Sequence, residues 1–157
     1  MADYIGELRA VIGTRPIIMC GANVILINSK NEILLHHRVD NDCWGLPGGA
    51  MELEESLEDT ARREVFEELG LSCGDLKLFN VYSGKDYYYK YPDGNEVFNV
   101  TATYLCREFE GEMVVDPVEG KEAKYFALDE IPKPLSEPIK KIIEEFLAVM
   151  FAKALEI

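Results

Sequence analysis

The chain has 157 residues, of which 48% are hydrophobic, so it is long enough to bury a real core within one domain, residues 1–157. Acidic residues outnumber basic ones by 29 to 16, and the net charge of −13 argues against binding to a nucleic-acid polymer or to an anionic membrane. Four scattered cysteines without a C-x-x-C pair, and an N-terminus unlike a signal peptide, predict a cytoplasmic protein with reduced thiols.

The first predicted element is a short helix within residues 1–14, which Gly13 is expected to end. Its apolar side chains have helical spacing: Tyr4, Ile5, Leu8, Val11 and Ile12. Strands are then predicted at residues 17–27 and 32–38, joined by a polar turn.

The second of these strands ends in His36, His37 and Arg38. Neighbouring residues of a strand point to opposite faces, which argues against a metal clamp made by the two histidines and predicts one of them near the surface. Arg38 is a candidate to contact a substrate phosphate, and a structural salt bridge is the equal alternative.

A glycine-rich loop at residues 44–49, WGLPGG, leads toward the central helix, and its small residues let the backbone approach a metal or phosphate closely. Ser56 followed by Asp59 has the form of a helix N-cap with an acidic third residue. A helix is therefore predicted from Leu57 to Leu69, with Gly70 as its left-handed stop.

Three glutamates, Glu64, Glu67 and Glu68, share one side of this helix at about 100° per residue. Their arc overlaps the apolar face, where carboxylates are costly and repel one another unless positive charge compensates them. A divalent cation such as Mg²⁺ is the natural compensation, and it would polarise a phosphate and acidify a water. A glutamate left free of the metal could accept the water's proton, and Arg63 could orient a glutamate or contact phosphate. The alternative is a solvated acidic face held by salt bridges.

Residues 49–71 fit the pattern G-x5-E-x7-R-E-U-x-E-E-x-G-U, where U is aliphatic. The fixed positions are Gly49, Glu55, Arg63, Glu64, Glu67, Glu68 and Gly70. The segment resembles the Nudix box, the signature of the Nudix hydrolases. The resemblance to the family fold covers most of residues 17–152, and it implies an α/β (α+β) protein, an α/β/α sandwich with a mixed central sheet.

The resemblance also implies an activity and a metal site. Nudix hydrolases cleave a nucleoside diphosphate linked to another group, with Mg²⁺, or Mn²⁺ as a possible substitute, held by the box glutamates. A glycine carbonyl commonly joins the metal shell; Gly48 and Gly49 are both candidates, and we take Gly49 as the ligand and Gly48 as a substrate contact. Glu54 departs from the glycine that relatives frequently carry there.

After the helix, a strand is predicted at residues 76–82, followed by a hairpin of residues 87–91 and 96–107 around a Pro-Asp-Gly-Asn turn. Four tyrosines surround this turn, and Tyr88 is the candidate to stack on a nucleobase. Strand propensity explains the same tyrosines without a function.

A short strand pair is predicted at residues 113–115 and 124–128. Glu122 lies on the expected loop before the second strand, where some Nudix enzymes place an additional glutamate that binds metal or acts as a base; Glu119 is the weaker candidate. Residues 138–153 form an amphipathic helix that covers the sheet, with partner binding as the alternative.

The main hypothesis is a metal-dependent hydrolase acting on a nucleoside triphosphate, a nucleotide sugar or a dinucleoside polyphosphate. Its catalytic candidates are Glu64, Glu67, Arg63 and Glu122. The alternatives are a non-catalytic nucleotide sensor and an isomerase of an isoprenoid diphosphate, which needs a reactive cysteine such as Cys43. The partner is a small nucleotide derivative, and the apolar N-terminal helix with the tyrosine-rich hairpin suggests a homodimer.

Overall fold

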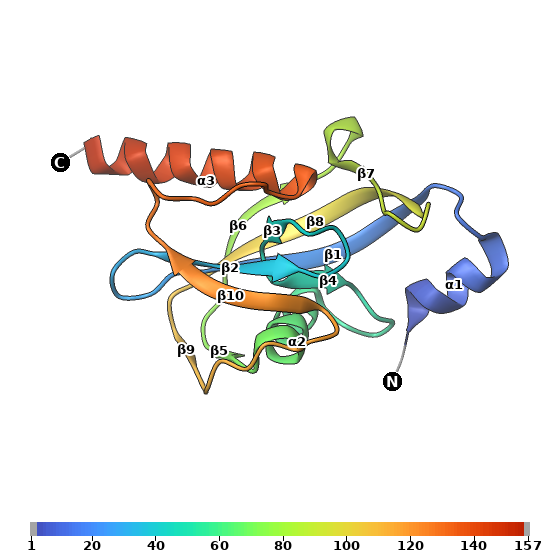
Figure 1. Cartoon of the computed structure of the whole chain (residues 1–157), viewed down its shortest axis with the longest axis horizontal. Helices are drawn as coiled ribbons and strands as arrows, with labels where there is room; N and C mark the ends of the chain where they lie inside the picture. Colours follow the sequence, from blue (N-terminus) through green and yellow to red (C-terminus); the bar gives the residue numbers. More distant parts are fainter. Residues whose placement is uncertain (1–2, 156–157) are drawn as a thin grey trace.

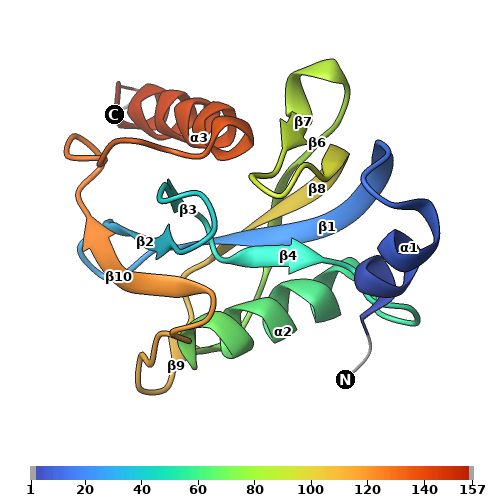
Figure 2. The same ribbon diagram turned by 45° about the vertical axis from the view of Figure 1, so that its right-hand side comes forward.

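A mixed β-sheet separates two long helices, α2 (Leu57–Leu69) on one side and α3 (Glu137–Leu155) on the other (Figure 1, Figure 2). The computed structural model describes residues 3–155, so the ends of the expected domain and the start of the expected N-terminal helix lie outside the described residues. A short helix, α1 (Tyr4–Ile12), precedes the sheet. The predicted α/β/α sandwich with a mixed sheet is confirmed.

The larger sheet has the strand order β4 (Gly48–Ala50), β1 (Ile17–Leu26), β8 (Glu96–Cys106) and β6 (Lys77–Tyr82). A further strand, β7 (Tyr88–Lys90), pairs with the first residues of β8 and so forms the predicted hairpin. The β1–β8 pair is parallel over its whole length, while the other pairs are antiparallel. Strand β1 pairs with β4 on one side and with β8 on the other. The glycines of β4 are therefore one strand away from the polar residues of β8.

A second sheet is formed by β10 (Gly120–Phe126), β2 (Ile33–Arg38) and β3 (Trp44–Gly45), and a two-stranded pair by β5 (Ser72–Cys73) and β9 (Phe109–Glu110). A 3-10 turn, η1 (Lys85–Tyr87), leads into β7. The antiparallel β2–β10 pairing fixes the end of β2, and with it Arg38, beside Gly120.

Helix α2 has the predicted bounds because its end signals are local. The Ser56 side chain accepts from the Asp59 backbone N–H at 3.0 Å, and the Ser56 N–H donates to the Asp59 carboxylate at 3.1 Å. Gly70 ends the helix with φ of 71°, in the left-handed region. These two caps set the position of every box residue between them.

The predicted strand at residues 113–115 is wrong. The backbone N–H groups of Val114 and Asp116 instead donate to the carbonyls of Leu69 and Glu68, each at 2.9 Å, and so satisfy the last turn of α2. The strand predicted to begin at Lys124 begins at Gly120, because its pairing with β2 extends that far.

Two hydrophobic clusters lie on the two faces of the larger sheet. One joins the apolar face of α2 to the sheet through Ala61, Val65 and Leu69, all fully buried. The other lies under α3 around Phe146, so α3 covers the sheet as predicted. Over residues 3–155, no helix combines the length and apolar character that crossing a bilayer requires.

Candidate active site

Two carboxylates of α2 meet the glycine strand β4. Glu68 is only 2% exposed, and its Oε1 lies 3.4 Å from the backbone N–H of Gly48. Glu64, one turn earlier, lies against Gly49 so closely that a Cβ at residue 49 would come within 2.5 Å of its Oε1. A Cβ at Gly48 would lie 2.3 Å from the carbonyl oxygen of Ala22. Gly48 is therefore required for the close pairing of β4 with β1, and Gly49 leaves the space that the Glu64 carboxylate occupies.

Glu64 and Glu68 lie one turn apart on α2 and affect each other's ionisation. Burial, followed by the charge of Glu68, raises the pKa of Glu64 to about 8. Burial also raises the pKa of Glu68 to about 7, although the positive charge of Arg38 opposes this rise. Burial and the repulsion between the two carboxylates therefore both disfavour full ionisation of the pair.

Arg63 hydrogen bonds to three acidic residues of the box, one of which is Glu64. Its Nη1 donates to Glu64 at 2.9 Å and to Glu67 at 3.2 Å, while Nε and Nη2 bind the carboxylate of Glu55. Its Nη2 also donates to the carbonyl of Ala50 at 2.9 Å, which ties the helix to β4. Arg63 therefore contacts both Glu64 and Glu67, and its role in orienting a glutamate stays a prediction.

His36, which the sequence suggested only as half of an unfavoured two-histidine clamp, lies behind Glu68. His36 is fully buried, and its Nδ1 lies 3.1 Å from Glu68 Oε2, although the geometry is not that of a regular hydrogen bond. Burial lowers the pKa of His36, so the ring is neutral. His37 is partly exposed and stacks on Trp44 at 4.8 Å, so the two histidines form no metal clamp. The strand alternation at residues 36 and 37 was the available signal.

The carboxylate pair fits a divalent cation. Glu68 Oε2 is buried without a hydrogen-bond partner in the described chain, so positive charge there would relieve its desolvation. Within residues 3–155, no group of three or more His, Cys, Asp or Glu side chains is arranged to hold a metal. Two carboxylates are nonetheless enough for Mg²⁺, which usually completes its shell with waters and substrate phosphates.

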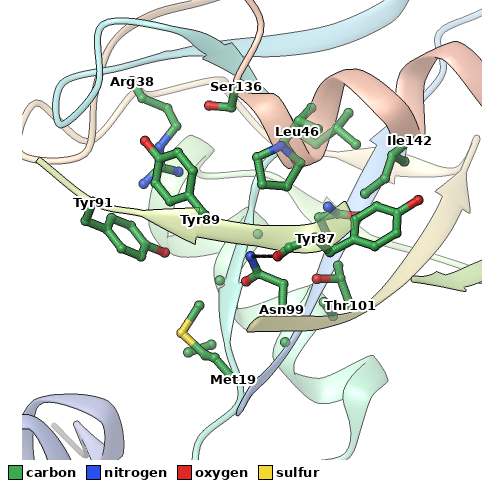
Figure 3. A pocket seen from close by; sticks show the side chains of 18 of the residues that line it. Met19, Arg38, Leu46, Tyr87, Tyr89, Tyr91, Asn99, Thr101, Ser136 and Ile142 are labelled. Carbon is green, nitrogen blue, oxygen red and sulfur yellow. Dashed lines mark hydrogen bonds between the residues drawn. The ribbon is translucent and has the colours of Figure 1, made fainter. Parts of the chain in front are cut away.

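A cavity of about 320 Å³ lies beside these glycines (Figure 3). Its walls come from β1, β4 and β8, from residues 87–91, here called the tyrosine segment, and from the start of α3. Polar and aromatic side chains line it together with aliphatic ones, among them Met19, Arg38, Leu46, Tyr87, Tyr89, Tyr91, Asn99, Thr101, Ser136 and Ile142. A largely apolar space with a few polar groups is typical of a small-molecule site.

Asparagine side chains hold the cavity wall together. Asn41 Nδ2 donates to the Tyr89 hydroxyl at 3.0 Å and to Ser136 Oγ at 2.8 Å, so it joins the tyrosine segment to the start of α3. Asn99 Nδ2 donates to the Tyr87 carbonyl at 2.9 Å, which leaves Asn99 Oδ1 as an acceptor (Figure 3). Neither asparagine was predicted from the sequence. For Asn99, the available signal was the alternation of polar residues along β8.

Tyr88, the tyrosine chosen from the sequence, lies outside the cavity. It is 37% exposed, its hydroxyl bonds to Glu96, and its ring packs on Phe98 at 5.2 Å. Strand alternation explains the difference, because Tyr89 and Tyr91 face the opposite way and line the cavity with their rings 4.8 Å apart.

Glu122 lies within β10 rather than on a loop, and its carboxylate pairs with Lys124 at 3.3 Å. No contact of the described residues joins it to Glu64 or Glu68. Glu119, the weaker candidate, is the closer of the two electrostatically, since its charge contributes to the raised pKa of Glu68. Arg38, Gly48 and Gly49 all line the cavity, and their contacts with substrate or metal stay predictions.

The decisive comparison is with a family model. Residues 19–146 match the model described as NUDIX domain, which covers most of the chain. The chain belongs to the Nudix family. The acidic helix, its glycine strand and the adjoining cavity are thus the parts of a Nudix domain.

Individual relatives agree with this assignment. The chain is 33% identical over 125 residues to the ADP-ribose pyrophosphatase of Methanocaldococcus jannaschii, covering 78% of this chain and 69% of that protein. It is 30% identical over 126 residues to a Bacillus subtilis protein provisionally named an 8-oxo-dGTP diphosphatase, covering 80% and 78%. The crystal structure of a MutT NUDIX hydrolase from Burkholderia pseudomallei superposes with a TM-score of 0.69 at 30% identity, covering 83% of this chain and 97% of that one.

These relatives support an enzyme of the Nudix type, and Nudix hydrolases in general use divalent metal ions. The isomerase alternative needs a reactive cysteine, and the surroundings of Cys43 do not favour one. That thiol donates to the carbonyl of Asn41 at 3.3 Å, and burial raises its pKa. A protonated thiol is a poor nucleophile.

Proposed function

We propose that this Nudix protein is a Mg²⁺-dependent hydrolase that cleaves a phosphoanhydride bond in a nucleoside diphosphate linked to another group. The observation that carries the proposal is the approach of buried Glu68 and partly buried Glu64 to Gly48 and Gly49, at the edge of a cavity large enough for a nucleoside. Burying two carboxylates together is unfavourable on its own, and a cation shared with substrate phosphates removes that cost.

Each residue of the site has a proposed part. The metal would take its ligands from Glu64, Glu67 and Glu68 and from the Gly49 carbonyl, and whichever of the three glutamates stays free of it would accept a proton from the attacking water. Arg63 keeps Glu64 and Glu67 in position through its two hydrogen bonds. The tyrosine rings and Leu46 enclose the nucleoside, with Gly48 beside the phosphates. A divalent cation bound there supplies positive charge to the phosphates and makes a water more acidic.

The proposal predicts that Glu67→Gln or Glu68→Gln removes most turnover. A panel of nucleotide derivatives, including ADP-ribose, UDP-glucose, dinucleoside polyphosphates and nucleoside triphosphates, is incubated with Mg²⁺, with Mn²⁺ or with a chelator, and products are resolved by chromatography. We expect hydrolysis that depends strictly on the metal, and a loss of about 10²- to 10⁴-fold in kcat for either variant.

Folding must be measured alongside turnover. In a chelator, Glu68→Gln should melt at or above the temperature of the wild type, because it removes a buried carboxylate. Glu58→Gln, an exposed position on the same helix, is the control and should keep full activity. Unchanged turnover in both box variants would contradict the proposal, and nucleotide binding without hydrolysis would favour the sensor alternative.

We also infer a cytoplasmic setting and a homodimer. All four cysteines are free thiols, as expected of a reducing compartment. Several large apolar side chains are exposed on the N-terminal part and the tyrosine hairpin, including Val11 at 84% and Ile18 at 74%. These side chains are where subunits would pack.

A further inference from the structure

Asp40 holds Arg38 in a two-point ion pair at the cavity wall. Arg38 Nε donates to Asp40 Oδ1 at 2.9 Å, and Arg38 Nη2 donates to Asp40 Oδ2 at 3.1 Å. Both residues line the cavity. A guanidinium binds a phosphate through the same pair of parallel bonds. The group best suited to receive a phosphate here is therefore already bound to a carboxylate of the same chain.

Arg38 lines the same cavity as Gly48 and Gly49, the glycines against which Glu68 and Glu64 lie. Tyr89 and Tyr91 line this cavity too. Substrate phosphates that lie against the two glycines would therefore share the cavity with the guanidinium. Figure 3 shows Arg38, Tyr89 and Tyr91 among the side chains that line this cavity.

No second positive side chain is available at this wall. Among the residues that line the cavity, all within the described chain, Arg38 is the sole cationic side chain and Asp40 the sole acidic one. Arg63 is engaged by the carboxylates of Glu55, Glu64 and Glu67. The cavity lining therefore has no net charge, and it adjoins an acidic helix on a chain of net charge −13.

The charge of the substrate decides what such a site accepts. A nucleoside diphosphate joined to a sugar carries about two negative charges at neutral pH, one on each phosphate. A nucleoside triphosphate carries nearly four, because the second pKa of its terminal phosphate is about 6. The metal proposed at the glutamates would neutralise charge on the reacting phosphates of either substrate. The additional charge of the triphosphate therefore needs a further cation from the protein.

We propose that Asp40 determines specificity: by occupying Arg38, it restricts the substrates to nucleoside diphosphates linked to an uncharged group, such as a sugar, and disfavours nucleoside triphosphates. This inference rests on the hydrolase function proposed above. In the reaction, the oxygen of a water bonds to one phosphorus, and the bond from that phosphorus to the bridging oxygen breaks. The bridging oxygen leaves with the electron pair on the other phosphate, and the water's proton passes to a glutamate. The products are a nucleoside monophosphate and the phosphorylated sugar.

The test compares ADP-ribose with ATP, which share the adenosine group and differ in phosphate charge. Rates are measured with the full-length enzyme in excess Mg²⁺, as kcat/KM. The wild type should prefer ADP-ribose by about 100-fold or more, and Asp40→Asn should raise the ratio of ATP to ADP-ribose by about tenfold, because a released guanidinium gains charge-assisted bonds to phosphate. If the panel favours uridine compounds, UDP-glucose and UTP form the matched pair.

Asp42→Asn is the matched control. Asp42 lies two residues away, its side chain is 69% exposed, and it pairs with Lys121 and His37 outside the cavity. Its φ of 55° is one that asparagine tolerates. This variant also removes one negative charge, but it should leave the substrate ratio unchanged.

The outcomes separate the two proposals. Equal or better hydrolysis of ATP by the wild type would overturn the role of Asp40, even if Asp40→Asn failed to fold, and so would the same shift in both variants. The hydrolase function would survive either result. Absence of hydrolysis of any nucleotide in the panel would remove the hydrolase function and the inference with it.

Discussion

Glu55 shows how one box residue acts without reaching the substrate. Its carboxylate is 17% exposed and accepts from Arg63, from the Thr60 hydroxyl at 2.7 Å and from the Glu52 N–H at 3.0 Å. The hydrogen bond from Arg63, with smaller contributions from Glu52 and Thr60, lowers the pKa of Glu55 to about 2. Glu55 thus joins the loop before α2 to Arg63, the residue proposed to position Glu64 and Glu67.

The lowered pKa predicts an acid-dependent loss of stability. A carboxylate whose folded pKa lies below its unfolded value of 4.5 stabilises the fold above that pH, and the contribution is lost as the pH falls toward about 2. Glu55→Gln should therefore be less stable than the wild type at pH 7, by a margin that shrinks between about pH 5 and pH 3. Urea unfolding at a series of pH values measures this margin. Glu144→Gln, exposed on α3, should follow the wild type throughout, and a constant margin for Glu55→Gln would count against the ion pair.

Single residues also mark the limit of what the sequence could predict. Helical geometry placed Glu64 and Glu68 together because they are one turn apart, so a local rule was sufficient. His36 approaches Glu68 from strand β2, and Asn41 donates to Ser136, which is 95 positions away in the sequence. Such contacts depend on how the strands pair, which no local pattern encodes. Tyr88 was chosen from the sequence, but its neighbour Tyr89 lines the cavity. A shift of one position along a strand places a side chain on the opposite face.

At the scale of elements, those that carry their own end signals were predicted best. Helix α2 has a capping box at Ser56 and a left-handed glycine at its end, and its predicted bounds are confirmed. The segment at residues 113–115 has the apolar composition of a strand, but its backbone N–H groups bond to the end of α2 instead. Composition predicts that a segment is extended, whereas the available partner decides whether it becomes a strand.

The capping box predicts a measurable contribution to stability. Ser56→Ala removes the acceptor for the Asp59 N–H, which should lower the free energy of unfolding by about 1 kcal/mol. The melting temperature should fall by about 2–4 °C for a chain of this size. Ser29→Ala, in the exposed turn between β1 and β2, is the control and should melt as the wild type does. Because α2 carries the proposed metal ligands, a loss of metal affinity should accompany the lower melting temperature.

At the scale of the whole molecule, the site depends on all three layers. Helix α2 supplies the carboxylates, the sheet supplies the glycine backbone and the polar residues of β8, and α3 closes the cavity with Ile139 and Ile142. Both isoleucines also pack into the hydrophobic cluster under α3, so the cavity wall and the core are continuous. The apolar spacing of α3 predicted that it covers the sheet, but not that its first turns line the cavity.

This continuity predicts that a core substitution in α3 will affect the site. Phe146 is fully buried and packs edge-on against Phe79 at 5.9 Å, so Phe146→Ala should cost about 3–5 kcal/mol of unfolding free energy. Phe151→Ala, one and a half turns further along the same helix and 50% exposed, should stay within about 0.5 kcal/mol of the wild type. Guanidinium unfolding measures both. At a temperature where Phe146→Ala remains folded, its KM for the best nucleotide substrate should also rise, because the looser core no longer fixes Ile139 and Ile142. A lower stability with an unchanged KM would show that the cavity wall is independent of the core beneath it.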